Sequence, residues 1–106
     1  MSKEVLVLFV WSREVEWSSR VAEQCLEITS PTLVLRSISA DSIEIRTILA
    51  NSTPHIDYVP AIISIAKTKG LVEKEVVVIY GEEEIETLLV TLGVLNREYN
   101  SERDIR

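Results

Sequence analysis

HIDYVPAIISIAKTKG, residues 55–70, places a proline directly before the most continuous strand-like run in the middle of the chain. Proline has no amide hydrogen to give to a sheet, so a strand interior normally excludes it, while the first position of a strand tolerates it. Pro60 therefore predicts the start of a strand over residues 61–66. Both a trans and a cis Val59–Pro60 bond fit this position, and the cis form would turn the preceding loop sharply. A turn at residues 67–70 then leads to a strand near residues 75–80.

Hydrophobic periodicity divides the rest of the chain into strands and helices. The unbroken apolar run at residues 5–11 is typical of a strand that is covered on both faces of a parallel or mixed sheet. Apolar residues at helical spacing predict three amphipathic helices, and a short apolar stretch after Pro31 predicts another strand. The helices are predicted at residues 13–28, 42–50 and 82–92, and the short strand at residues 32–35.

The predicted order of elements is β-α-β-α-β-β-α. Strands joined by a helical crossover are expected to be parallel, and strands joined by a short turn antiparallel. We therefore expect an α/β fold, with a four-stranded mixed sheet flanked by three helices in one domain over residues 1–95 and a polar tail at residues 96–106. Asp41 and Glu44 have the spacing of a capping box for the second helix.

Composition excludes several classes of function. With 17 acidic and 11 basic residues among 106, the net charge is −6, which argues against nucleic-acid binding through phosphate neutralisation and against docking on anionic membranes. The apolar run of seven near the start is too short to span a bilayer. Cys25 is the only cysteine, so an intramolecular disulfide is impossible and an intracellular location is expected.

The element order, with Pro60 at the threshold of the third strand, resembles the thioredoxin-like superfamily in its small, glutaredoxin-sized form. The resemblance covers roughly residues 4–93 and includes the stretch Tyr58-Val59-Pro60-Ala61-Ile62-Ile63, the lysine-glycine hairpin and the glutamate-rich final helix. It implies that the Val59–Pro60 bond is cis and that Pro60 faces the site at the start of the first helix.

Catalytic members of that family carry Cys-x-x-Cys or Cys-x-x-Ser between the first strand and the first helix, where the helix start lowers the thiol pKa. Here the segment reads WSREVEWSSRV, residues 11–21. Ser12 and Ser18 compete for the attacking position, with Val15 and Trp17 in the same degenerate region, and neither serine supplies a sulfur. We therefore predict no dithiol catalysis, and we interpret Cys25 as a buried, inert thiol on the apolar helix face.

Two small-molecule readings are weaker. His55 is the only histidine and has no second ligand nearby in the sequence, so we interpret it as a surface loop residue and predict no metal site and no cofactor. In related glutaredoxins, glutathione pairs with the backbone beside the proline and its carboxylate is held at the start of the last helix. Gly81 matches that position, but the three glutamates after it oppose an anionic ligand, so glutathione binding stays the less favoured alternative to protein binding.

The favoured hypothesis is a redox-inactive thioredoxin-fold protein that acts in protein binding or assembly. The predicted binding residues are Trp11, Trp17, Tyr58, Val59 and Pro60, because exposed aromatic residues are enriched at interface hot spots. In the parent family this surface receives an extended chain, which implies a protein partner here. The overall pattern looks most like small thioredoxin-like proteins encoded by large DNA viruses. This resemblance implies an intracellular, cytoplasmic location, with the virus particle as a second option.

Overall fold

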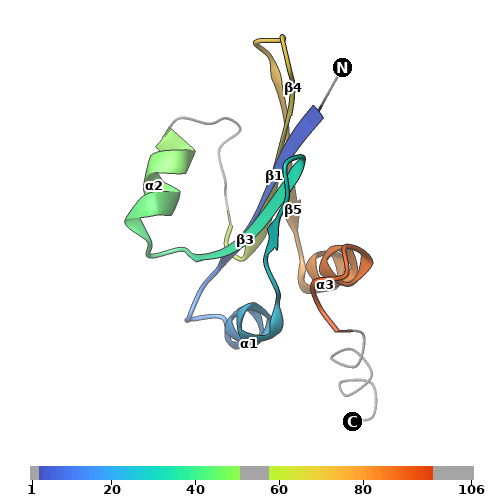
Figure 1. Ribbon diagram of the computed structural model, residues 1–106. Coiled ribbons are helices and arrows are strands. Elements are labelled where there is room, and N and C mark those ends of the chain that lie inside the picture. Colours follow the sequence, from blue (N-terminus) through green and yellow to red (C-terminus); the bar gives the residue numbers. More distant parts are fainter. Residues whose placement is uncertain (1–2, 51–57, 97–106) are drawn as a thin grey trace.

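One mixed sheet organises the part of the chain that this computed structural model describes, residues 3–50 and 58–96 (Figure 1). Its strands lie in the order β2-β3-β1-β4-β5. The strands are β1 (Lys3–Trp11), β2 (Ile28–Thr29), β3 (Leu33–Ser39), β4 (Ala61–Thr68) and β5 (Lys74–Tyr80). The helices are α1 (Glu16–Gln24), α2 (Ile43–Ala50) and α3 (Glu82–Thr91).

Two of the strand directions agree with the prediction: β1 and β3, joined by the α1 crossover, are parallel, and β4 and β5, joined by a short turn, are antiparallel. One direction differs. β4 follows β3 through the helix α2 and is therefore expected to be parallel to it, but β4 runs antiparallel to β1 and so also to β3. The sheet has five strands rather than the predicted four, because the two-residue strand β2 adds antiparallel to the outer edge of β3.

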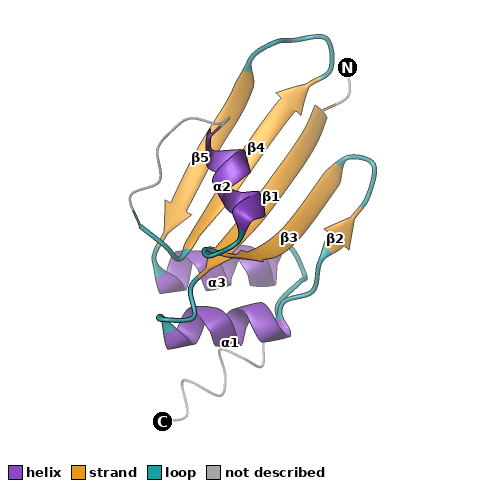
Figure 2. Cartoon of the chain, turned by 90° about the vertical axis from the view of Figure 1, so that its left-hand side faces the viewer, coloured by secondary structure: helices purple, strands orange, loops and turns teal. Residues whose placement is uncertain are grey.

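The two faces of the sheet carry different helices (Figures 1 and 2). On the two-helix face, alternate β1 residues such as Val7 and Phe9 pack against α1 and α3. On the one-helix face, the intervening residues Leu8 and Val10 pack against Ile45 of α2. Because successive strand residues point to opposite faces, the unbroken apolar run of β1 serves both clusters.

The first helix is shorter than predicted at both ends. It covers residues 16–24 instead of 13–28, because the residues before it form a turn in which the Val15 amide donates to the Ser12 carbonyl at 3.1 Å. At its other end the Leu26 amide donates to the carbonyl of Val94 at 2.8 Å, which takes the chain away from the helix axis. Ile28, expected in the helix, therefore belongs to β2.

Smaller differences concern strand lengths and one helix cap. β3 is longer than the predicted strand at residues 32–35, and β4 continues to Thr68 into the predicted turn. α2 begins at Ile43, and the Ser42 hydroxyl accepts the Glu44 amide at 3.1 Å, so Ser42 caps this helix rather than Asp41. Asp41 instead lies 3.5 Å from Arg13 in an exposed ion pair.

The last helix agrees with its prediction. Ile85 and Leu89 are buried against the two-helix face, with Leu88 and Leu92 partly buried beside them. Gly81 precedes the helix with a φ of +96°, a conformation that favours glycine. The Val59–Pro60 peptide bond is cis, and β4 begins at the next residue. Predictions for His55 and for the tail beyond Asn96 fall outside the described residues.

Candidate functional site

The candidate site lies at the edge of the sheet where β1 ends and β4 begins. Val10 of β1 pairs with Ala61 of β4. Trp11, the residue after Val10, and Pro60, the residue before Ala61, are therefore neighbours at this edge. The parallel strands β1 and β3 both end here, opposite each other at Trp11 and Ser39. Open α/β sheets place ligand sites beyond the carboxyl ends of their parallel strands, so this edge is the natural position for a binding surface.

The loop between β1 and α1 is held closed by Ser18, whose side chain is fully buried. The Ser18 hydroxyl lies 2.8 Å from the carbonyl oxygens of both Ser12 and Val15, and it accepts the Ser12 amide at 3.1 Å. The Ser12 hydroxyl accepts the Glu14 amide at 3.2 Å. Both candidate serines therefore stabilise the loop through hydrogen bonds, and neither has a general base beside it among these contacts.

The aromatic residues of the site do not form one group. Tyr58 is 70% exposed and makes an edge-to-face contact with Tyr80, with ring centroids 5.5 Å apart. Trp11 and Trp17 are partly buried and pack against the cluster on the two-helix face. Tyr80 lies four residues after Val76 on β5, and residues an even number apart on a strand share a face. The Tyr80 side chain is therefore on the one-helix face, as that of Val76 is. The expected gathering of three aromatics thus becomes a tyrosine pair on one side and two packed tryptophans on the other.

The residues next to Pro60 are open. Val59 is exposed, and among the described residues its backbone makes no hydrogen bond with another backbone group. Several acidic residues belong to the segments that follow β1, β3 and β5 at this edge, and Arg13 is the basic residue in those segments within the described part of the chain. The acidic residues are Glu14 and Glu16 beside α1, Asp41 before α2, and Glu82, Glu83 and Glu84 at the start of α3.

The start of α3 is acidic where the resemblance implies a ligand carboxylate. A Cβ atom added at Gly81 would collide with a carboxylate oxygen of Glu84, so that carboxylate folds back over the glycine. Acids at a helix start are stabilised by the positive end of the helix dipole. Here the glutamates of α3 itself interact with the positive end of the helix dipole, and their negative charge would repel a bound anion.

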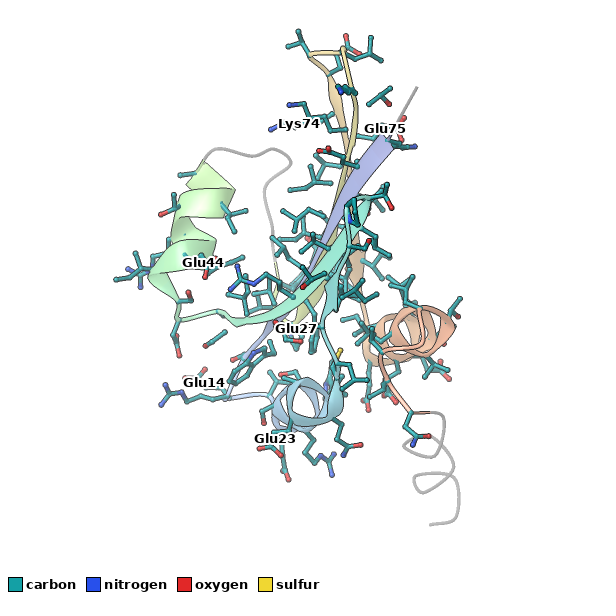
Figure 3. All side chains as sticks on the ribbon, in the orientation of Figure 1. Glu14, Glu23, Glu27, Glu44, Lys74 and Glu75 are labelled. Carbon is teal, nitrogen blue, oxygen red and sulfur yellow. The ribbon has the colours of Figure 1, made fainter. Side chains whose placement is uncertain are left out.

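Cys25 is the C-cap of α1 and lies at the opposite end of this helix from the Ser12 loop. It borders a surface hollow of about 560 Å³ together with Trp11, Ser19, Ala22, Glu23, Glu27 and Ser37. Burial raises the pKa of the thiol, the nearby Ser37 hydroxyl lowers it in part, and the charge of Glu27 raises it further. Glu23 and Glu27 lie along the α1 side of the molecule in Figure 3. The thiol is therefore half-buried, as opposed to the fully buried position that was predicted.

Comparisons with protein-family models, curated proteins and solved structures find no match to this chain. Among residues 3–50 and 58–96, no three histidine, cysteine, aspartate or glutamate side chains gather in a metal-binding arrangement. No helix in the described part of the chain has both the length and the apolar character that crossing a bilayer requires.

Sequence reasoning missed two features of the site. The role of Ser18 as the clasp of the loop has no local signal, because its main partner, Ser12, is six residues away. The contact of Tyr58 with Tyr80 depends on the antiparallel pairing of Ala61 with Tyr80, which brings the end of β5 beside the start of β4. A predicted register for that hairpin would have revealed it.

Proposed function

We propose that this protein is a thioredoxin-like binding module without redox activity, which holds an extended segment of a partner protein at the edge formed by Tyr58, Val59 and Pro60. The observation that carries the proposal is the exposed residue Val59, whose backbone forms no hydrogen bond with another described backbone group, beside the exposed Tyr58 ring. An open backbone segment offers hydrogen bonds to an extended chain, and a tyrosine offers apolar area with a polar tip.

The sheet order supports the thioredoxin-like assignment in this proposal. A parallel β1–β3 pair, an antiparallel β4–β5 hairpin next to β1, and Pro60 before β4 reproduce the arrangement that the resemblance implies. The edge strand β2 is an addition to that arrangement.

The charges at the edge define the partner more closely. Because the segments at this edge carry six acidic side chains and one arginine, a bound segment that carries basic side chains gains favourable electrostatics and faster association. An apolar side chain on the same segment would pack on Tyr58. We therefore propose an extended segment with alternating apolar and basic residues. The narrower form of the proposal is an assembly role within a virus particle.

Binding is tested with peptides selected from a random unstructured library against the purified chain. The expected binders are basic and apolar, and Tyr58→Ala weakens their binding at least about tenfold, the scale of a hot spot. Leu26→Ala is the matched control, since Leu26 is an exposed apolar residue just after the C-terminal end of α1, at the opposite end of that helix from the Ser12 loop. Binders whose affinity is unchanged by Tyr58→Ala contradict the proposed surface.

The absence of redox activity is tested by insulin reduction with dithiothreitol as the electron source. The purified chain is expected to give the rate of the blank, because its one thiol lies at the end of α1 and carries a raised pKa. Reduction above the blank that disappears in Cys25→Ser would establish a monothiol activity and overturn this part of the proposal.

A further inference from the structure

The two lateral edges of the sheet, formed by β2 and β3 on one side and by β5 on the other, differ in how the chain protects them from pairing with another strand. The outer edge of β3 is covered by β2, and farther along the Ser37 amide meets a carboxylate oxygen of Glu27 at 3.4 Å. A charged side chain and a short covering strand both prevent another strand from docking. β5 lies at the opposite edge, and within residues 3–50 and 58–96 it pairs with β4 and with no second strand.

β5 has few of the features that protect an edge strand. It spans seven residues without a proline, and its centre is the run Val76-Val77-Val78-Ile79. Val77 is 54% exposed, and in the hairpin turn that leads into the strand Val72 is 95% exposed. Lys74 and Glu75 are its charged residues, both at one end, and their side chains point to opposite faces of the sheet in Figure 3. Long apolar edge strands are templates for pairing with another chain.

The backbone groups that β5 presents to solvent follow from the ladder. In β1 the Val5 amide donates to Thr32, and Trp11 accepts from Ala40, so odd-numbered residues of β1 face β3. Even-numbered residues of β1 must then face β4, because alternate residues of a strand direct their backbone groups to opposite sides. The same alternation carried across the β1–β4 and β4–β5 registers turns odd-numbered residues of β5 toward β4. The residues that face outward therefore include Lys74, Val76 and Val78.

We propose that β5 pairs antiparallel with β5 of a second copy of this chain, around a two-fold axis at Val76. In this register Val76 faces Val76 of the second copy, and Lys74 faces Val78 in two symmetric pairs. Each such pair exchanges two backbone hydrogen bonds, so the three outward-facing residues satisfy one another. Two five-stranded sheets then continue as one.

A second copy is the occupant that the charges favour. The register places Glu75 opposite Val77 of the other copy and directs the hairpin turn of one copy toward the start of its partner's α3. That turn carries Lys69 and Glu73, and in this register Lys69 is the one of the two that lies nearer to Glu82, Glu83 and Glu84 at the start of the partner's α3. The approach of Lys69 to the acidic helix start occurs twice in the dimer, since the interface is isologous. The inference does not depend on the proposed function, because the residues paired in the dimer, Lys74 to Val78, do not include Tyr80, the residue of β5 that contacts Tyr58.

Analytical ultracentrifugation of the full chain tests the pairing. An interface of one strand pair is smaller than a standard protein interface, so a dissociation constant on the order of 10–100 μM is expected. In Val77→Glu, the new glutamate of each copy would face Glu75 of the other copy. This like-charge pair occurs twice and should raise the dissociation constant at least about tenfold. Glu75→Lys added to Val77→Glu should restore dimerisation, because each lysine then faces a glutamate. Ile43→Glu on the exposed part of α2 is the control and should leave the constant unchanged.

Amide hydrogen exchange gives a readout that needs no variant. Going from dilute to concentrated protein should slow exchange of the Val76 and Val78 amides, while the Val77 amide, which faces β4, is protected at both concentrations. A chain that stays monomeric up to about 1 mM, or a dimer whose strength Val77→Glu does not change, overturns the proposal. Loss of the dimer in Val77→Glu without recovery in the double variant overturns the register at Val76.

Discussion

Ser18 lies in the first turn of α1 with its side chain fully buried. It is one of the two serines that compete for the position of the attacking cysteine in the family that the chain resembles. Its hydroxyl contacts the backbone of Ser12 and Val15, so the residue supports the loop and has no exposed oxygen for chemistry. Removing a buried hydroxyl leaves its hydrogen-bond partners unsatisfied, and each unsatisfied buried group lowers the free energy of unfolding. At the scale of single residues, the candidate site is therefore a rigid loop.

Ser18→Ala is expected to lower the free energy of unfolding by about 1–3 kcal/mol, because the Ser12 amide loses its acceptor and the carbonyl groups of Ser12 and Val15 lose the one hydroxyl hydrogen that they share. Urea denaturation measures the change. Ser19→Ala is the matched control: its hydroxyl makes one hydrogen bond, to Glu16, in an exposed setting, so a change below about 0.5 kcal/mol is expected. Equal losses in both variants would show that Ser18 is no special clasp.

Cys25 predicts a pH dependence of stability. The folded state holds the pKa of this thiol above its ordinary value, mainly through burial. As the pH rises through the ordinary thiol range near about 8.5, the unfolded chain loses the proton first, so the folded state binds more protons and stability falls. We expect the difference in unfolding free energy between the wild type and Cys25→Ser to shift against the wild type from pH 8 to about pH 10. A difference that stays constant over this range would contradict the raised pKa.

At the scale of elements, predictability followed the length of the periodic pattern. α3 repeats its apolar face through Ile85, Leu88 and Leu89 and ends at a glycine, and its position agreed with the prediction. The end of α1 depends on the distant Val94 carbonyl, which no local pattern reveals. β2 is two residues long and exists through its pairing with β3, so it has no periodicity of its own. Likewise the edge of the candidate site was predictable from Pro60, but the separation of its aromatics into two groups needed the register.

α2 offers an internal comparison of two isoleucines. Ile45 is 1% exposed in the cluster with Leu8 and Val10, whereas Ile43 is 78% exposed two residues earlier. We expect Ile45→Ala to reduce the free energy of unfolding by about 2–4 kcal/mol, since it removes buried methyl groups and leaves a cavity. Ile43→Ala should change it by less than about 0.5 kcal/mol. Thermal or urea unfolding of the two variants checks the contrast, and similar losses would mean that α2 is not anchored through Ile45.

At the scale of the whole molecule, the sheet divides the described residues into two unequal halves. The two-helix face buries Val21 of α1 together with Ile85 and Leu89 of α3, while the one-helix face holds α2 through Ile45 and an exposed Arg36–Glu44 ion pair. Exposed ion pairs contribute little to stability. Figure 1 shows α2 alone on its side of the sheet, and among the described side chains of this helix Ile45 and the partly buried Ile48 belong to the hydrophobic cluster there. We infer that α2 can open while the rest of the fold stays intact.

Native-state hydrogen exchange tests this unequal division. Helical amides of α2, such as that of Ile48, should exchange about 10–100-fold faster than those of Leu88 and Leu89 in α3, which corresponds to an opening free energy lower by about 1.4–2.8 kcal/mol. Glu44→Gln should widen the gap slightly, because it weakens the ion pair with Arg36 and leaves the two-helix face untouched. Exchange of α2 and α3 at the same rate, with equal sensitivity to low denaturant, would mean that both faces of the sheet open in one cooperative step.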